Sequence, residues 1–427
     1  MKILWLCNVI PPVIANQLNT ETTVKEGWID ASLRRLLKDD NREIKLGICM
    51  PASSLDSPCK KDEVKVEGRQ ISLFRFLEQT EKPWVYDKTL ETVFAGIIKE
   101  FDPDIIHIFG TEYPHALACV RAGENKEKIL VGIQGVMSAC ARHYTGGLPE
   151  EIINKTTFRD WLKKDNIASQ QRKFELRAGF EKEILEKVSH VTGRTAFDRE
   201  EVLKINPDLN YHSMNETLRP QFYDGDWRPE RLHDHGIFVS QADYPLKGFH
   251  VLLDAMPDIL KEYPDAHINV AGNSITGYKT IKEKIKIGTY GDYLRKLIYK
   301  YDLNGKVTVL GKLDAQDMKK QYEDNSIYVC TSYIENSPNS MGEAMLVGIP
   351  CVVPETGGIP SMADKDCAVF YEPGNSKQLA DSIIELFGND KKALDLSGNA
   401  KKRAGINHDA VNNYKRLLEI YDKICQE

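Results

Sequence analysis

Short apolar runs of strand length alternate with helix-period segments along most of the chain, and this alternation constrains the fold more than any other feature. The first half shows it clearly, because apolar runs at 3–7, 44–49 and 105–109 are separated by amphipathic stretches at 28–38 and 86–100. Strands that alternate with helices build a parallel sheet with helices on both faces. The sequence therefore predicts an α/β protein with doubly wound sheets.

The alternation is interrupted once, by the polar stretch R-P-Q-F-Y-D-G-D-W-R-P-E-R-L-H-D-H at about 219–235. Two prolines and many charges without a period are typical of a linker, and the β/α pattern restarts after it. We therefore predict two Rossmann-like domains, an N-terminal one over 1–222 and a C-terminal one over 223–407. The helix in the remaining segment, 408–427, is expected to cross back to the first domain.

A longer helical insertion is predicted within the first domain, over 151–187. It is rich in charged residues and contains the apolar side chains Phe158, Trp161 and Phe174. Such a segment can be a solvated helix packed on its own domain, or it can lie on a membrane surface. Both interpretations remain open at this point.

The bulk composition excludes several classes of protein. The net charge of −6 provides no global basic field that would attract nucleic acid. No apolar run approaches the roughly 20 residues that a spanning helix requires, and the first residues do not form a signal peptide. The nine cysteines show no C-x-x-C spacing, which indicates free thiols in a reducing compartment. We expect a cytoplasmic protein, with peripheral attachment to a membrane left open.

The sequence also gives no sign of a metal site. A metal-binding D-x-D motif in a sugar transferase should close a strand, and the histidines show neither H-x-x-x-H nor H-E-x-x-H spacing. We therefore expect no catalytic metal. The D-x-D pairs, none of which closes a predicted strand, are Asp102/Asp104, Asp224/Asp226 and Asp364/Asp366.

The segment I-E-N-S-P-N-S-M-G-E at 334–343 holds two carboxylates, Glu335 and Glu343, with seven residues between them. It follows a predicted buried strand at 326–331 and leads into a predicted helix, so Glu335 should lie on the loop at the carboxyl end of the strand. Ligands of doubly wound sheets bind at these strand ends. The free N–H groups of a helix N-terminus favour an anion such as a diphosphate.

Glu343 is expected in the first turn of that helix, with Asn339 or Ser340 as the N-cap. A carboxylate there can accept hydrogen bonds from two vicinal hydroxyls, such as those of a ribose. A second interpretation needs no ligand, because Ser340 and Glu343 also fit the capping-box pattern S-x-x-E. The segment alone leaves the two interpretations open.

Three further features favour a ligand site. Lys247 and Gly248 follow the strand that opens the second domain, where a lysine can reach a phosphate. Gly357 and Gly358 end another strand and allow a close backbone approach. Gly27 lies near the end of the loop that follows the first strand. Each of these alone is also compatible with a surface lysine or a simple turn.

Taken together, these residues resemble the retaining, nucleotide-sugar-dependent glycosyltransferases of family 4, which have the GT-B fold. The resemblance rests on the E-x7-E pair and on 348–358, G-I-P-C-V-V-P-E-T-G-G, which continues it in register. It is strong over about 236–388 and weaker over the first half. It implies two Rossmann-like domains that face each other across a cleft. The E-N-S-P-N-S variant is similar to enzymes of bacterial capsule, exopolysaccharide or O-antigen assembly.

The resemblance also implies roles for individual residues. Glu343 should hold the ribose hydroxyls, Glu335 the donor sugar, and Lys247 the diphosphate. Arg142 and His143 are expected on the acceptor side. The remaining residues expected to contact the donor are Gly27, Gln241, Ser337, Asn339, Ser340, Met341 and Gly342.

The chain departs from the family pattern in three places, the first being the usual Gly-Gly of the first loop, which is Glu26-Gly27 here. Many relatives have an arginine shortly before the lysine, where this chain has Gln241; Arg219 is a candidate to supply the charge. Many also have a functional histidine in the first domain, where Gln134 stands here. Gln134 donates hydrogen bonds but does not shuttle protons near pH 7, and we expect it to contribute to catalysis in that limited way.

The implied activity is transfer of a sugar, with retained configuration and without metal or cofactor, from a nucleotide diphosphate sugar to an acceptor hydroxyl. A uridine donor is slightly favoured. The implied acceptor is a glycan or a polyprenyl-linked glycan, which would bring the first domain to the inner face of the membrane. The alternatives are a GT-B phosphorylase, a nucleotide-sugar epimerase and a non-catalytic nucleotide-sugar-binding module.

Overall fold

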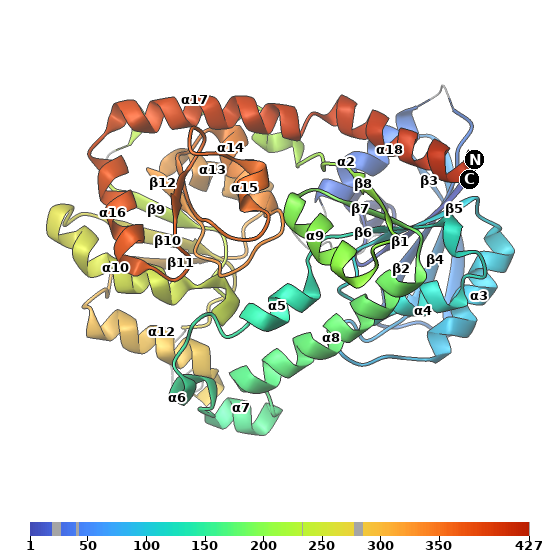
Figure 1. The fold of residues 1–427 in the computed structure, drawn as a ribbon, viewed down its shortest axis with the longest axis horizontal. Helices are drawn as coiled ribbons and strands as arrows, with labels where there is room; N and C mark the ends of the chain where they lie inside the picture. The colour runs from blue at the N-terminus through green and yellow to red at the C-terminus, as the bar shows by residue number, and fades with distance from the viewer. Residues whose placement is uncertain (19–26, 40–41, 233, 277–284, 427) are drawn as a thin grey trace. The chain divides into compact units, whose positions relative to one another are not determined.

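The computed structural model describes residues 1–18, 27–39, 42–232, 234–276 and 285–426, which fall into two compact units (Figure 1). Unit 1 consists of Met1–Ser138, Phe174–Leu218 and His408–Glu427. Unit 2 consists of Ala139–Lys173 and Arg219–Asn407. The predicted architecture of two Rossmann-like α/β domains is confirmed.

Unit 1 is built on an eight-stranded sheet with the order β3-β4-β2-β1-β5-β6-β7-β8. All neighbouring strands are parallel except β3 and β4, which form an antiparallel hairpin at the edge. This hairpin was not predicted from the sequence, because β3 reads C-K-K-D-E-V-K-V and has no apolar run. The strands are β1 Lys2–Cys7, β2 Lys45–Ala52, β3 Cys59–Val66, β4 Arg69–Leu77, β5 Ile105–Phe109, β6 Ile129–Gly132, β7 His190–Gly193 and β8 Asn210–Ser213.

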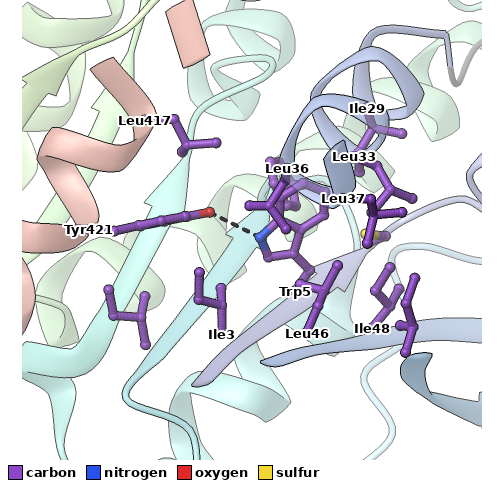
Figure 2. Close-up of a cluster of buried hydrophobic side chains, with 14 of the residues drawn as sticks. Ile3, Trp5, Ile29, Leu33, Leu36, Leu37, Leu46, Ile48, Leu417 and Tyr421 are labelled. Carbon is purple, nitrogen blue, oxygen red and sulfur yellow. Dashed lines mark hydrogen bonds between the residues drawn. The ribbon is translucent and has the colours of Figure 1, made fainter. Parts of the chain in front are cut away.

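The core of unit 1 joins the first strand of the chain to its last helix (Figure 2). The indole N–H of Trp5 donates to the hydroxyl of Tyr421 at 3.0 Å, and both side chains are buried. Nδ1 of His107 lies 2.7 Å from the same hydroxyl. The helices that belong wholly to this unit are α1 Pro12–Leu18, α2 Gly27–Lys38, α3 Thr89–Phe101, α4 Pro114–Ala122, α9 Ala196–Ile205 and α18 Ala410–Gln426.

Unit 2 is built on a six-stranded sheet with the order β11-β10-β9-β12-β13-β14, in which all neighbouring strands are parallel. Its strands lie within two residues of the runs predicted as strands from the sequence, which are 236–240, 267–271, 307–310, 326–331, 350–353 and 368–371. They are β9 Gly236–Val239, β10 His267–Ala271, β11 Val307–Gly311, β12 Ile327–Val329, β13 Cys351–Pro354 and β14 Val369–Tyr371.

The helices of unit 2 include α17, which the sequence analysis did not predict because its apolar residues follow the helical period only weakly. A short 3₁₀ helix, Pro245–Lys247, follows β9 and precedes α10. The α-helices are α6 Glu150–Ile153, α7 Phe158–Lys163, α10 Phe249–Glu262, α12 Thr289–Lys300, α13 Ala315–Asp324, α14 Asn339–Val347, α15 Ile359–Met362, α16 Ser376–Phe387 and α17 Asp390–Asn407.

The helical insertion differs from the prediction. It is divided into α6, α7 and α8 (Ile167–Lys187), and residues up to Lys173 group with unit 2. The reason is a set of polar contacts to α12. The buried carboxylate of Asp160 accepts the N–H of Thr289 at 2.7 Å and its hydroxyl at 2.6 Å, and Lys155 pairs with Asp292 at 2.7 Å. Among the described residues, no helix combines the length and apolar character needed to span a membrane.

Candidate functional site

The two glutamates of the E-x7-E segment lie on either side of the start of α14 in unit 2. Glu335 occupies the loop between β12 and α14, and its carboxylate is 2.5 Å from Nζ of Lys247. The hydroxyl of Ser332 donates to the same oxygen at 2.6 Å. The fold thus brings together the residues that the sequence assigned to the sugar and to the diphosphate.

Two glycines allow the loops to approach closely enough for this ion pair. Gly248 has φ +63°, and a Cβ there would lie 2.0 Å from the carbonyl oxygen of Thr331. Gly357 has φ +52°, and a Cβ there would lie 2.1 Å from the carbonyl oxygen of Glu335. The N–H of Gly358 donates to that same carbonyl at 2.9 Å. Any other residue at 248 or 357 would strain the backbone and push the loops apart.

The electrostatics of Lys247 favour a fixed positive charge. Burial alone would lower the pKa of its ammonium, but the carboxylate of Glu335 and the neighbouring Tyr244 raise this pKa well above its ordinary value. The side chains of the pair are only 16% and 14% exposed. An ammonium group has three donors, so the bond to Glu335 leaves two for another acceptor.

Glu343 is held by Arg219, which forms two parallel hydrogen bonds to its carboxylate at 2.7 and 2.8 Å. The guanidinium carbon of Arg219 lies 4.8 Å from the centroid of the Phe222 ring. Burial raises the pKa of the Glu343 carboxyl, and the hydrogen bonds from Arg219 oppose that rise. A carboxylate has about four lone-pair sites, so the arginine leaves roughly two of them for other donors.

The capping-box interpretation of this segment is wrong. Helix α14 begins at Asn339, and its N-cap is Pro338, which forms no side-chain cap. Ser340 is therefore the second helical residue, and its hydroxyl lies 3.0 Å from that of Tyr328. Glu343 is the fifth residue, in the second turn rather than the first, and its carboxylate is directed to Arg219. The predicted cap at Asn339 or Ser340 is corrected accordingly.

The expected donor contacts at the start of α14 are only partly available. The N–H groups of Met341 and Gly342 donate to the carbonyl of Pro338 at 3.0 and 3.2 Å, so the first turn already uses them. The side chain of Met341 is fully buried, and Ser337 is buried in the preceding loop. Gln241 is half-buried and lies just beyond β9.

A loop that follows α5 (Met137–His143) lies against the Lys247 segment. A Cβ on Gly146 would be 2.2 Å from the carbonyl oxygen of Pro245, and the carbonyl of Gly146 is 2.9 Å from Nε2 of His250. Burial lowers the pKa of His250 to about 4, so this histidine is neutral near pH 7. His250 was not predicted as a site residue, because a single histidine at the start of a helix forms no recognisable motif.

The acceptor-side candidates Arg142 and His143 are the last two residues of α5 and belong to unit 2. They are followed by Tyr144, whose ring is nearly parallel to that of Tyr244 at a centroid distance of 6.1 Å. Tyr244 is three residues before Lys247. Arg142 and His143 themselves are exposed, and their role on the acceptor side stays a prediction.

Gln134 and Gly27 belong to unit 1. Gly27 is the first residue of α2, and Gln134 follows β6 and donates to the carboxylate of Glu216 at 2.5 Å. Arg194 donates to the other oxygen of that carboxylate at 2.8 Å. This network lines a cavity of about 30 Å³, together with residues of α2 and α18. No sequence pattern indicated that Glu216 and Arg194 would surround Gln134.

No cluster of three or more histidine, cysteine, aspartate or glutamate side chains suited to a metal ion is found in the part of the chain that the structure describes. That the reaction requires no metal ion stays a prediction.

Comparisons with known proteins identify the family that unit 2 matches. Residues 232–403 match the sequence model of the family "Glycosyl transferases group 1". Spore coat protein SA of Bacillus subtilis is 26% identical over 191 residues, which are 44% of this chain and 48% of that protein. The chain thus spans less than half of the length of this curated relative.

Solved structures resemble the chain over almost its whole length. Sucrose-phosphate synthase from Thermosynechococcus elongatus has a TM-score of 0.71 at 14% identity and covers 99% of both chains. Anabaena HepE, solved in complex with UDP and glucose, has a TM-score of 0.65 at 15% identity and covers 99% of this chain and 100% of its own. At such identities the likeness concerns the fold, which is that of GT-B proteins. Residues 232–403 therefore form a domain of the glycosyl transferases group 1 family, within a chain of the GT-B fold.

Proposed function

We propose that the chain is a glycosyltransferase whose unit 2 binds a nucleotide diphosphate sugar at the E-x7-E segment. The observation that supports this most is a pair of partly buried cation–carboxylate contacts, Lys247 with Glu335 and Arg219 with Glu343. Lys247 follows the carboxyl end of β9, and Glu335 and Glu343 follow that of β12, where ligands of such parallel sheets bind. In this proposal Glu343 accepts the ribose hydroxyls, Lys247 contacts the diphosphate, and Glu335 contacts the donor sugar.

Arg219 fixes the orientation of Glu343 in the proposed site. Its fork holds the carboxylate plane through two parallel bonds, and the remaining lone pairs suit two adjacent hydroxyl donors. Arg219 was a candidate for the phosphate-binding charge missing before Lys247. Because its guanidinium forms two hydrogen bonds to Glu343, we favour a role in positioning that carboxylate instead.

The proposed reaction breaks the bond between the anomeric carbon and the diphosphate oxygen and forms a bond to the acceptor oxygen on the same face. The leaving phosphate oxygen takes the acceptor's proton, so configuration is retained and no protein base is needed. Lys247 stabilises the charge that develops on the diphosphate, which is the task a metal ion performs in other transferases. Glu335 stabilises positive charge at the anomeric carbon.

We propose a uridine donor, because HepE is similar in fold and was solved with UDP and glucose. The proposed acceptor is a hydroxyl of a glycan or of a polyprenyl-linked glycan in bacterial surface polysaccharide synthesis. Arg142 and His143 are the proposed contacts to it, since they are exposed and immediately precede Tyr144, whose ring stacks on Tyr244. Gln134 contributes from unit 1 by hydrogen bonding.

The test is release of nucleotide from UDP-, GDP-, ADP- and dTDP-sugars, followed by chromatography in the presence of a chelator. A glycosyltransferase releases the nucleotide slowly with water and faster with an acceptor alcohol, and the product keeps the anomeric configuration. A phosphorylase would require free phosphate, and an epimerase would change the sugar without releasing nucleotide. Binding without any turnover would contradict the proposal and indicate a non-catalytic module.

A further inference from the structure

Helix α7 presents three large apolar side chains to solvent on one face. Phe158, Trp161 and Leu162 are 61%, 66% and 66% exposed. Their spacing of three and four residues places them on the same side of the helix. Single exposed apolar residues are ordinary on protein surfaces, but a group of three on a six-residue helix indicates a surface that something covers.

The opposite face of α7 is polar and buried. Asp160 is 1% exposed and binds both the N–H and the hydroxyl of Thr289 at the start of α12. The hydroxyl of Thr157, which caps α7, donates to the carbonyl of Ile287 at 2.9 Å. These bonds hold the helix with its polar side inward, so the apolar side chains stay in solvent.

Basic residues border the apolar face. Lys163 and Lys164 follow Leu162 directly and are exposed. The nearest acidic residue along the chain, Asp165, is already paired with Lys173 at 2.6 Å. Aromatic side chains beside lysines suit the boundary between water and an anionic lipid surface, where the rings enter the headgroup region and the ammonium groups meet negative charge.

We propose that the apolar face of α7, with Lys163 and Lys164, docks unit 2 on an anionic lipid bilayer. A second copy of the chain fits less well, because a stable dimer buries about 800 Å² on each partner and a six-residue helix offers far less. The inference concerns a surface outside the sugar-transfer site. It does not depend on the proposed reaction, since lipid binding is measured without a nucleotide sugar.

The experiment is co-sedimentation of the full chain with vesicles of phosphatidylcholine alone or with 30% phosphatidylglycerol. We expect binding to the anionic vesicles that weakens with salt. The triple variant Phe158→Ser, Trp161→Ser, Leu162→Ser should bind at least about tenfold more weakly. Lys163→Gln with Lys164→Gln should lose roughly tenfold or more, because each basic residue near such a surface contributes about fivefold.

A matched control removes two exposed apolar residues elsewhere in unit 2, Tyr299→Ser with Ile406→Ser, which are 81% and 74% exposed. This control should bind vesicles within twofold of the parent chain, and circular dichroism checks that all variants are folded. Equal sedimentation of the parent and the triple variant would overturn the proposal, as would absence of the parent from the lipid pellet. A concentration-dependent dimer that only the triple variant loses would also overturn it and identify a second copy as the occupant.

Discussion

The two units have similar sheets, but one buried carboxylate of unit 1, Glu181, has surroundings that differ from those of Glu335 and Glu343 in unit 2. In unit 2, Glu335 and Glu343 each contact a cation that belongs to another loop of the same unit. In unit 1, Glu181 accepts hydrogen bonds from neutral groups, the hydroxyl of Thr111 and the N–H groups of Met137 and Ser138. Burial raises the pKa of Glu181 to about 7, whereas Lys247 and Arg219 provide lasting positive charge in unit 2.

This difference matters for function. Charges fixed in a partly buried site can stabilise developing charge without reorganisation, which suits the leaving group of a sugar transfer. The matched family range, 232–403, lies entirely in unit 2, and so do both ion pairs. Of their four residues, only Arg219 lies outside the matched range. We therefore expect the residues that act on the donor to lie in unit 2 and those of unit 1 to have a smaller effect on turnover. The following predictions test this division.

The largest effect is expected for Lys247→Ala. Losing a charged contact to the leaving group should lower kcat by on the order of 10²–10³, measured as nucleotide release from the preferred donor. The matched control is Lys261→Ala, which removes a lysine of unit 2 whose side chain is 70% exposed. Unchanged turnover in Lys247→Ala would refute its role at the diphosphate.

Arg219→Ala tests the second ion pair. It leaves the buried carboxylate of Glu343 without its partner, so the free energy of unfolding should fall by about 3 kcal/mol in urea denaturation. The control Arg228→Ala removes an exposed pair with Asp226 and should cost under about 1 kcal/mol. Equal losses in the two variants would show that Arg219 does not hold Glu343 as described.

Glu181→Gln tests whether the surroundings of the buried carboxylate in unit 1 raise its pKa. The folded pKa of about 7 lies above the ordinary 4.5, so the folded state binds more protons between these values and loses stability as pH rises through them. A glutamine at this position does not ionise, so the variant does not lose this stability as pH rises. Its stability relative to the parent chain should rise by roughly 3 kcal/mol from pH 4.5 to pH 7 and level off above. A difference that does not depend on pH would contradict the account.

Features that depend on a local residue pattern were predicted from the sequence, whereas features that depend on contacts between distant residues were not. Apolar runs located the strands of unit 2, but the charged edge strand β3 and the weakly amphipathic α17 gave no such signal. The E-x7-E spacing located two carboxylates. Their partners could not be predicted, because Lys247 is 88 residues from Glu335 and Arg219 is 124 residues from Glu343. Only folding brings these charges together.

The smallest effect is expected for Gln134→Ala in unit 1. The variant loses the hydrogen bond from Gln134 to Glu216, but Glu216 keeps its bond from Arg194. The free energy of unfolding should therefore fall by only about 1 kcal/mol. Turnover should fall by about tenfold or less, far below the effect at Lys247. The control is Gln70→Ala, whose exposed amide contacts Glu63. A loss of 10³ in Gln134→Ala would move essential chemistry into unit 1.

The central claim is that unit 2 binds a nucleotide diphosphate sugar through Glu343. The most direct test is a thermal-shift titration of the parent chain, Glu343→Ala and the exposed control Glu355→Ala with UDP- and GDP-sugars in chelator. A ligand at 100 Kd should stabilise the parent and the control by roughly 2.7 kcal/mol and leave Glu343→Ala unshifted. Equal stabilisation of all three, or of none by any nucleotide sugar, would contradict the account.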